Sequence, residues 1–404
     1  MFSRRTAWPI AKNPLTSAVE ARRAAGLPLI DLTLTNPTQT GLDLPFAEIE
    51  AALQSIDFST YQPDSLGSLA ARLAVAAHHQ QAVPAENIVL SASTSEAYGW
   101  LFKLLCNPGD RILTPQPSYP LLQYLAQLEN VEMDTYCAHY ADGWHIDIAQ
   151  LQHAWTPQTR AVVVVTPNNP TGCALSPQAA DAISQFCAEK GLALICDEVF
   201  ADTLLFQTDK QKTLASNRTC LTFVLSGLSK VCLLPQCKLG WTLVCGPADL
   251  VRAAMQRLEI IADTWLSVAT PIQHALPALL RLRPQIQLVL QQRLAQNDAQ
   301  LQIFADRTAV SVLRADGGWT RVLQLPRVLS DENWALYLLD AGVLLQPGYY
   351  FDFDRDDFLV LSLLPPPDVF ARGLAIVSQC VAQAVASAEA TGHCASLPTD
   401  TSAF

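Results

Sequence analysis

Basic side chains are scarce in this sequence, and no run of them is present. Lysine and arginine total 26 of 404 residues against 37 aspartates and glutamates, which gives a formal net charge of −11. Because nucleic-acid-binding proteins concentrate positive charge along one face or segment, this balance predicts no nucleic-acid partner. Charged residues of both signs make up only 16 %, and 50 % of the residues are hydrophobic. We therefore expect a large buried core in one large domain with a smaller companion.

Long hydrophobic runs are also missing. No apolar stretch reaches the roughly 18 residues that a membrane-spanning helix needs, so the sequence predicts no membrane partner. The N-terminal segment MFSRRTAWP lacks the apolar core of a secretory signal, which favours a cytoplasmic location. The mean hydropathy of +0.19 is nevertheless high and indicates extensive burial between subunits.

Cysteine is present, but without the spacing of a metal site. Many of the 11 cysteines lie within apolar runs, as buried thiols of a reducing compartment do. Cys232 and Cys237 are the closest pair, and neither a second pair nor a histidine cluster accompanies them. We therefore predict no metal site. His78 and His79 are expected to be solvated helix positions.

Short apolar runs alternate with helical patterns between about residues 87 and 246, which is typical of a parallel sheet crossed by helices. Between two of these runs, Ser176 suits a helix N-cap, Pro177 the first turn and Gly191 the exit. We predict an α/β fold with a mostly parallel seven-stranded sheet, helices on both faces, and a smaller α+β domain. The expected strands are 87–92, 110–115, 131–137, 161–166, 192–197, 220–225 and 241–245.

The domain organisation follows from changes in texture along the chain. A largely helical stretch after Pro247 runs to about residue 305 and is expected to link two domains. The last segment is rich in small and polar residues, as loose tails are. The predicted parts are an N-terminal arm belonging to the small domain (1–45), a large domain (46–285), a small C-terminal domain (286–387) and a tail (388–404).

A lysine and an aspartate follow two of the expected strands. Asp197 closes the run LALICD, and Lys230 lies 33 residues further on, at the end of SGLSK. An amine able to form an imine, with a carboxylate that keeps a pyridinium nitrogen protonated, is the minimum equipment for pyridoxal-phosphate chemistry. Taken alone, a lysine after a serine is most often a solvated surface residue. The interpretation therefore depends on further motifs.

Further polar residues follow other strand ends. The run Ser93, Thr94, Ser95 opens a helical pattern, and the free amides of a helix N-terminus bind anions such as phosphate. In open α/β sheets the chemistry gathers beyond the carboxyl ends of the strands, where these residues are expected. The others are Tyr119, in PSYP, Asn169, in NNPTG, and Lys238, a second cation eight residues past Lys230.

The order and spacing of these motifs resemble the fold-type I pyridoxal-phosphate enzymes, the class I and II aminotransferase group, from about residue 31 to about residue 385. The resemblance implies that Lys230 is the Schiff-base lysine and that Asp197 is the partner of the ring nitrogen. Tyr119 would stack on the cofactor, and Asn169 would hydrogen-bond its phenolic oxygen. The phosphate would lie among Ser93, Thr94, Ser95, Ser226 and Lys238.

A homodimer is also implied, because Tyr61 resembles the tyrosine that family dimers lend to the neighbouring subunit's phosphate. The implied activity is that of a cytoplasmic pyridoxal-phosphate-dependent aminotransferase. It would move an amino group from an amino acid to a 2-oxo acid by a ping-pong mechanism through a Lys230 imine. Alanine or aspartate with 2-oxoglutarate are the default substrates.

Three positions depart from the family pattern. Phe200 replaces a Tyr that donates to the cofactor's phenolic oxygen, so we predict that the lysine-bound cofactor holds its proton to higher pH. Gly227 stands where a phosphate-binding Ser is common, with Ser226 or Ser229 as alternatives. Val360 stands where an Arg clamps the substrate's carboxylate bidentately.

Two questions about the substrate site remain open at this stage. Either another arginine binds the carboxylate, with Arg4, Arg5 and Arg321 as candidates, or the substrate is not an ordinary amino acid held in the ordinary way. Four aromatic residues either wall a substrate pocket or belong to the core of the small domain. These are Trp319, Tyr349, Tyr350 and Phe351.

Two other functions remain as alternatives. A lyase or decarboxylase on the same scaffold is compatible with the motifs, because they fix the cofactor but not the bond that breaks. A non-catalytic, cofactor-binding effector module of a transcription regulator is disfavoured, since no separate basic helix-turn-helix segment precedes the aminotransferase-like region.

Overall fold

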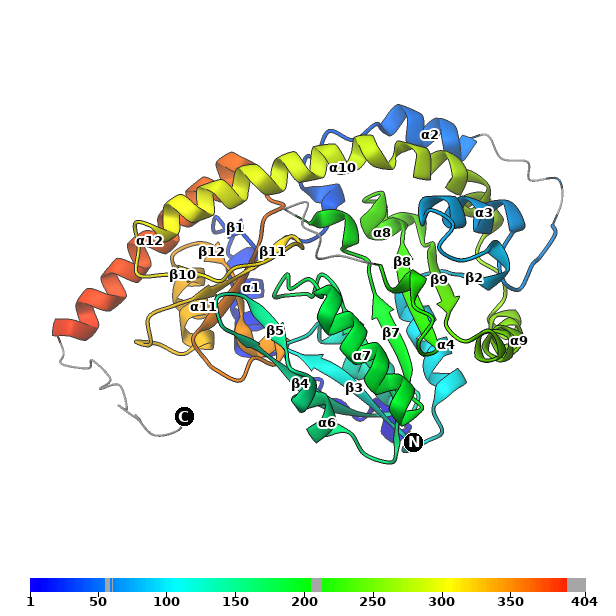
Figure 1. Cartoon of the computed structure of the whole chain (residues 1–404). Coiled ribbons are helices and arrows are strands. Elements are labelled where there is room, and N and C mark those ends of the chain that lie inside the picture. Colours follow the sequence, from blue (N-terminus) through cyan, green and yellow to red (C-terminus); the bar gives the residue numbers. More distant parts are fainter. Residues whose placement is uncertain (55–58, 60, 205–212, 391–404) are drawn as a thin grey trace. The chain divides into compact units, whose positions relative to one another are not determined.

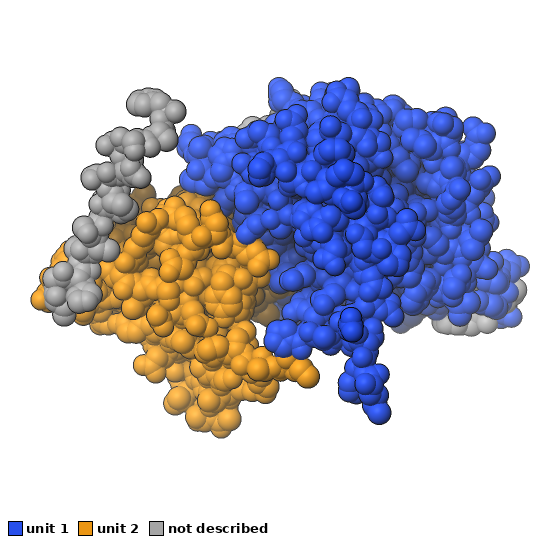
Figure 2. All heavy atoms as spheres, turned by 90° about the horizontal axis from the view of Figure 1, so that it is seen from below, with its two compact units in different colours: residues 1–9, 36–292, 314–319 blue, residues 10–35, 293–313, 320–404 orange. Residues whose placement is uncertain are grey.

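The structure, a computed structural model, describes residues 1–54, 59, 61–204 and 213–390. They form two compact units, which Figure 2 distinguishes by colour. The two units exchange chain segments more often than the predicted boundaries imply. Only the middle of the predicted arm 1–45 belongs to unit 2. Unit 1 comprises Met1–Pro9, Asn36–Gln292 and Arg314–Trp319, and unit 2 comprises Ile10–Thr35, Arg293–Leu313 and Thr320–Phe404.

Unit 1 is built on an eight-stranded sheet with the order β2-β9-β8-β7-β6-β3-β4-β5. Strands β8, β7, β6, β3 and β4 run parallel to their neighbours in this series, whereas β9 is antiparallel to both β8 and β2. The mostly parallel sheet is confirmed, and β5 extends it as an antiparallel edge strand next to β4. The strands are β2 (Ile88–Ser91), β3 (Arg111–Gln116), β4 (Glu132–Tyr140), β5 (Trp144–Ile146), β6 (Thr159–Val165), β7 (Ala193–Asp197), β8 (Thr222–Gly227) and β9 (Gly240–Cys245).

Helices cover both faces of this sheet (Figure 1). On one face α4 (Thr94–Leu105), α5 (Leu121–Leu128) and α9 (Ala248–Trp265) enclose a core that includes Phe102 and Phe223. On the other face α7 (Pro177–Lys190) crosses in front of the strands in Figure 1, next to α6 (Ile148–Ala154). Every residue of β7, β8 and β9 is buried, which explains why these strands are continuous apolar runs in the sequence.

Helix α7 begins and ends as its sequence predicts. The Ser176 hydroxyl accepts a hydrogen bond from the Ala179 amide (3.2 Å), and Pro177 occupies the first turn. Gly191 ends the helix in the left-handed conformation (φ 67°), which glycine adopts without steric cost.

The other helical elements connect the sheet to the rest of the chain. The long helix α10 (Thr270–Ala305) belongs to unit 1 up to Gln292 and to unit 2 from Arg293, in the stretch where the sequence analysis expected a helical link. The remainder of unit 1 comprises η1 (Arg4–Thr6), η2 (Pro37–Gln39), α2 (Phe46–Gln54), α3 (Leu69–His78), η3 (Ala85–Asn87), η4 (Ala201–Thr203), η5 (Leu214–Ser216), α8 (Leu228–Val231) and η6 (Pro235–Cys237).

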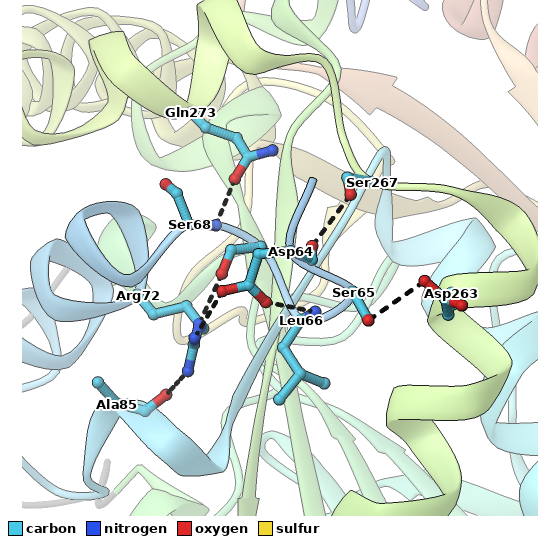
Figure 3. A network of polar contacts seen from close by, with 10 residues as sticks. Asp64, Ser65, Leu66, Ser68, Arg72, Ala85, Asp263, Ser267 and Gln273 are labelled. Atoms are coloured by element: carbon cyan, nitrogen blue, oxygen red, sulfur yellow. Dashed lines mark hydrogen bonds and ion pairs between the residues drawn. The ribbon is translucent and has the colours of Figure 1, made fainter. Parts of the chain in front are cut away.

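The segment that leads into α3 is fixed by a polar network (Figure 3). Arg72, whose side chain is buried, donates to Asp64 (3.1 Å) and to the Ala85 carbonyl (3.0 Å). The Ser68 amide donates to the Gln273 side chain (2.6 Å), which ties the segment to the start of α10. A buried guanidinium is stable only when its donors are satisfied, so this network holds the segment in one conformation.

His78 and His79 are half-buried rather than solvated as the sequence analysis expected. They end α3 with their rings edge-on to Trp241 of β9, and the Trp241 indole donates to His79 Nε2 (3.0 Å). Burial lowers the pKa of His79 to about 3, so this ring is a neutral acceptor. The prediction was wrong because helical spacing alone does not show which tertiary partner reaches a helix end.

Unit 2 is the predicted smaller α+β domain. A four-stranded antiparallel sheet has the order β10-β11-β14-β13, and β1 pairs in parallel with β12. The elements are α1 (Pro14–Ala24), β1 (Ile30–Asp31), β10 (Ser311–Val312), β11 (Thr320–Gln324), α11 (Asp331–Asp340), β12 (Val343–Leu344), β13 (Gln346–Pro347), η7 (Gly348–Phe351), β14 (Phe358–Ser362) and α12 (Pro367–Ala390).

Helix α12 is long and apolar enough to cross a membrane by length and composition, which the sequence analysis did not anticipate. Its buried side chains Phe370, Leu374, Val377 and Val381 recur at helical spacing, as in a helix that packs one face on a protein core. The helix also includes the first three residues of the predicted tail 388–404, and residues 391–404 lie outside the described part of the chain.

Candidate active site

Lys230 and Asp197 lie at the same edge of the sheet. Asp197 is the last residue of β7, and Lys230 is in α8, directly after the neighbouring parallel strand β8. The side chain of Asp197 accepts hydrogen bonds from the Tyr98 hydroxyl and from the Val199 amide, each at 3.1 Å. Burial raises the pKa of Asp197 to about 6, while these two donors and the Lys230 charge act in the opposite direction. At neutral pH the group is therefore mainly a carboxylate.

The Lys230 amine lies beside two aromatic rings. Its Nζ is 4.3 Å from the centroid of the Trp319 ring and 5.4 Å from that of Phe200, and the two rings meet edge to face. Burial lowers the pKa of Lys230 to about 8, partly offset by the Asp197 charge. The backbone is held as well, because Gln287 of α10 donates to the Lys230 carbonyl (3.2 Å). The site thus presents a fixed amine with an appreciable neutral fraction.

The N-terminus of α4 forms the third part of the site. The Ser93 hydroxyl accepts from the Glu96 amide (3.2 Å), and the Glu96 carboxylate accepts from the amide of Ala92, the residue before the cap (2.6 Å), in a variant of the capping box. Thr94 and Ser95 occupy the first turn, where backbone amides face outward along the positive end of the helix dipole. Ser93 is therefore the helix cap, and the first-turn groups are available to an anion.

Ser226 lies next to this helix start. Strand β8 pairs with β9 so that Gly227 faces Gly240, and an added Cβ at Gly240 would lie 3.1 Å from the Ser93 carbonyl carbon and 3.3 Å from the Ser226 carbonyl oxygen. The side chain of Ser226 is buried. The glycine pair thus brings two predicted phosphate ligands, Ser93 and Ser226, close together.

Asn169 carries an unsatisfied buried atom. Its Oδ1 is buried and has no hydrogen-bond partner within the described part of the chain. The neighbouring Asn168 is instead used structurally, because its Oδ1 accepts from the amide and hydroxyl of Thr171. A buried polar group without a partner is costly unless a ligand satisfies it, so Asn169 is a candidate ligand-binding residue.

The remaining predicted cofactor residues are more exposed. Tyr119, 50 % exposed, lies in the loop between β3 and α5. Lys238 is exposed and follows η6 in a left-handed conformation (φ 40°). Tyr61 is 72 % exposed and precedes the network of Figure 3. No contact joins these three side chains to the Lys230 and Asp197 cluster among the interactions of the described residues.

The unusual positions have physical explanations in two cases. Phe200 packs against Lys230 and Trp319. Its ring therefore makes apolar contacts at the position where the family pattern has a Tyr hydroxyl. At Gly227 a Cβ would lie 3.0 Å from both the Gly240 Cα and the Leu239 carbonyl oxygen, so a serine would crowd strand β9. The third position, Val360, is fully buried in β14 of unit 2 between Val322 and Gln346.

None of the three candidate arginines is linked by a described interaction to Lys230 or Asp197. Arg321 is buried in β11 of unit 2 and forms an ion pair with Asp298 (2.7 Å). Arg4 and Arg5 are exposed in η1, and Arg5 donates to the Leu128 carbonyl (3.0 Å) at the end of α5. The structure therefore does not assign the carboxylate clamp to any of them.

The four aromatic candidates separate into two groups. Trp319 belongs to unit 1 and lines the Lys230 site, whereas Tyr349, Tyr350 and Phe351 form η7 of unit 2. Tyr98 is a site residue that the sequence analysis missed. Its position four residues after Thr94, and therefore on the same side of α4, is the sequence feature that could have identified it.

This set of groups fits pyridoxal phosphate. Lys230 would hold the aldehyde carbon, Asp197 the ring nitrogen, the start of α4 the phosphate, and the side chain of Asn169, whose Oδ1 has no partner, a ring substituent. Metal chemistry has no comparable constellation, since the described residues contain no group of three His, Cys, Asp or Glu side chains that could hold an ion.

Known proteins share both the sequence pattern and the fold. The family model for aminotransferases of class I and II matches residues 30–365. The alanine aminotransferase of Mycobacterium tuberculosis is 29 % identical over 371 residues, which cover 88 % of this chain and 86 % of the relative. The glutamate-pyruvate aminotransferase AlaA of Escherichia coli is 25 % identical over 370 residues, covering 88 % and 91 %.

Solved structures agree at the level of the fold. An alanine aminotransferase from Pyrococcus furiosus superimposes with a TM-score of 0.86 at 21 % identity, covering 95 % of this chain and 100 % of the other. An aminotransferase from Escherichia coli gives 0.84 at 24 % identity, covering 95 % and 98 %. Because the family match spans most of the chain, this protein belongs to the class I and II aminotransferases and is a pyridoxal-phosphate-dependent enzyme that transfers amino groups.

Proposed function

We propose that this aminotransferase uses Lys230 to hold its cofactor covalently, and that it moves an amino group between alanine and 2-oxoglutarate in two half-reactions at one site. The observation that carries this proposal is the half-buried Lys230 amine, which lies next to Trp319 and whose pKa is affected by the charge of Asp197. Alanine and glutamate-pyruvate aminotransferases among the relatives support the choice of substrates.

Lys230 is suited to act both as nucleophile and as base. With a pKa of about 8, roughly one amine in ten is neutral at pH 7, about 300-fold more than for a solvated lysine of pKa 10.5. A neutral amine is required to attack a carbonyl carbon. Once the substrate amine takes its place, the released amine can accept the proton at the substrate's α-carbon.

Asp197 would hold the proton on the cofactor's ring nitrogen. When bound, pyridoxal phosphate supplies an electron-accepting ring that stabilises negative charge at the substrate's α-carbon. This requires a carboxylate, and the pKa of about 6 leaves Asp197 mainly ionised at neutral pH. A bound pyridinium would favour the ionised form further.

Two buried aromatic rings border the Lys230 amine. Trp319 is 1 % exposed and Phe200 is 5 % exposed, so both rings are fixed walls close to the reacting amine. An apolar surface of this kind suits the methyl group of alanine. The second carboxylate of 2-oxoglutarate would have to point away from these rings.

Half-reaction spectroscopy tests the proposal. Adding alanine to the loaded enzyme should convert the cofactor to its aminated form with release of one pyruvate, and 2-oxoglutarate should reverse the change. Borohydride should fix the cofactor on the peptide containing Lys230, and Lys230→Ala should lose this labelling, whereas Lys190→Ala should keep it. Ammonia or carbon dioxide release would instead indicate a lyase or a decarboxylase, and binding without turnover would indicate an effector module.

We also propose a homodimer that shares its sites through Tyr61. Support comes from large apolar side chains that unit 1 leaves exposed, including Tyr61 (72 %), Ile260 (70 %) and Leu266 (71 %). Mixing Tyr61→Ala with Lys230→Ala should restore part of the activity, because hybrid dimers would contain one intact site. Absence of any recovery in demonstrated hybrids would leave Tyr61 as a residue of its own subunit's surface.

A further inference from the structure

A buried tyrosine contacts the carboxylate that is expected to face the cofactor. Tyr98 lies on the second turn of α4, is 6 % exposed, and places its Oη 3.1 Å from Asp197 Oδ2. The other carboxylate oxygen, Oδ1, accepts from the Val199 amide at 3.1 Å. Each carboxylate oxygen has two lone-pair sites, so Oδ2 can accept one more donor while Tyr98 occupies the first.

The phenol can only be the donor in this contact. Burial raises the pKa of Tyr98 well above its ordinary value, and the charge of Asp197 raises it further, so the hydroxyl stays protonated. A donor to the charged form of a carboxyl group favours that form. The Tyr98 hydroxyl therefore opposes the effect of burial, which would otherwise protonate Asp197.

Helix α4 adds a second geometric constraint. Thr94, in the candidate phosphate site, and Tyr98 are four residues apart, so they lie on the same side of the helix about 6 Å apart along its axis. One helix thus reaches both the anion site and the carboxylate. A ligand with a phosphate and a basic ring nitrogen would bind its phosphate at the start of α4. Its ring nitrogen would bind Asp197, the carboxylate that Tyr98 of the same helix contacts.

We propose that Tyr98 is a positioning residue that keeps Asp197 ionised and directs the remaining lone pair of Oδ2 at the cofactor's ring nitrogen. The proposal rests on the assignment of Asp197 to that nitrogen. The Tyr98 hydroxyl would thus contribute to the preference of the site for a pyridine ring over other aromatic rings without contacting the ligand itself.

Two isosteric variants test it. Tyr98→Phe removes the hydroxyl that bonds to Asp197, and Tyr136→Phe removes an equally buried hydroxyl that bonds to the Val163 carbonyl (2.7 Å). Cofactor-free protein would be titrated with pyridoxal phosphate and with its 1-deaza analogue, in which CH replaces the ring nitrogen. A hydrogen bond to a charged group is strong enough that we expect Tyr98→Phe to weaken pyridoxal phosphate about 10-fold and the analogue less than about 2-fold.

The ratio of the two dissociation constants identifies the mechanism. Tyr136→Phe should leave this ratio unchanged, whatever it does to stability. If Tyr98→Phe weakens both ligands to the same extent, or leaves the affinity for pyridoxal phosphate unchanged, Tyr98 is a packing residue and the proposal is wrong. No amino acid is present in these titrations, so a failure of the proposed transamination would not imitate either result.

A second measurement does not depend on folding of the Tyr98 variant. In cofactor-free wild-type protein labelled with ¹³C at tyrosine Cζ, one of the nine tyrosine signals should shift with a midpoint near the Asp197 pKa of about 6. The same signal should be insensitive to pH in this range in Asp197→Asn. Nine signals that remain constant through this range in the wild type would overturn the proposed contact.

Discussion

A methyl group at Gly227 is expected to destabilise the protein, even though the backbone there suits any residue. The φ angle of Gly227 is 175°, which is ordinary extended backbone. The conflict is steric, because the new Cβ would lie 3.0 Å from the Gly240 Cα and from the Leu239 carbonyl oxygen. Strand β9 cannot move away freely, since Gly240 is itself packed against the start of α4 at Ser93.

The size of the effect follows from two opposing contributions. Overpacking a site of this kind costs about 1–3 kcal/mol, whereas replacing glycine by alanine restricts the unfolded chain and recovers about 0.4–1 kcal/mol. The net loss is therefore at most about 2.6 kcal/mol, with a central value of about 1.3 kcal/mol, and for a chain of this length it lowers Tm by about 1–3 °C. Gly99→Ala is the matched control, because its Cβ would meet only side-chain ends, the nearest 3.8 Å away, within α4. It should raise Tm by about 1 °C.

Thermal unfolding of the cofactor-free proteins, followed by circular dichroism, measures both variants under the same conditions. The reasoning is refuted if Gly227→Ala melts at or above the wild-type temperature, or if the two substitutions shift Tm in the same direction. Gly227→Ser should resemble Gly227→Ala in stability. It should also bind free phosphate no better than the wild type, because its hydroxyl enters at the expense of the strand pairing that positions α4.

Other predictions concern charge and burial. The folded pKa of Lys230, about 8, lies below its unfolded value, so its burial costs stability below pH 8 and this cost disappears as pH rises toward 10.5. Cofactor-free Lys230→Met should therefore melt higher than the wild type at pH 7, with a difference that shrinks by pH 10; a constant difference would contradict this. Phe200→Tyr should lower the pH at which the lysine-bound cofactor loses its proton, as measured by absorbance titration, and an unchanged or higher midpoint would count against the role given to this position. Arg72→Met should lower the free energy of unfolding by about 2–4 kcal/mol in a denaturant titration, because it removes the side-chain donor to the Ala85 carbonyl and the donor to Oδ2 of Asp64. The exposed Arg257→Met, which loses a single bond within α9, should change it by less than about 0.5 kcal/mol.

The central sheet could be predicted because its strands are covered on both faces. Burial of every residue makes β7, β8 and β9 continuous apolar runs, which are visible without tertiary information. Strand β5 is different, since the short edge segment Trp144–Ile146 alternates with exposed polar residues and offers no such run. The exchange of segments between the units could not be predicted from the sequence either, because β1 is only two residues long and its partner β12 lies far along the chain.

The site could be predicted where its residues directly follow strand ends. Asp197 and Lys230 meet because β7 and β8 are parallel neighbours, and that arrangement is implied by the alternation of strands and helices. Tyr98 contacts Asp197 from the middle of a helix, and Trp319 approaches Lys230 from a segment far along the chain. Both contacts depend on how helices and loops pack, which local sequence patterns do not encode.

The edge-to-face pair of Trp319 and Phe200 beside Lys230 also gives the enzyme an internal optical probe. An indole 4.3 Å from the amine that anchors a light-absorbing cofactor lies well within the range of resonance energy transfer. Its fluorescence should therefore be quenched on loading and recover on release. Replacing Trp319 by Phe would identify its contribution among the eight tryptophans, and would allow occupancy to be followed in real time without a label.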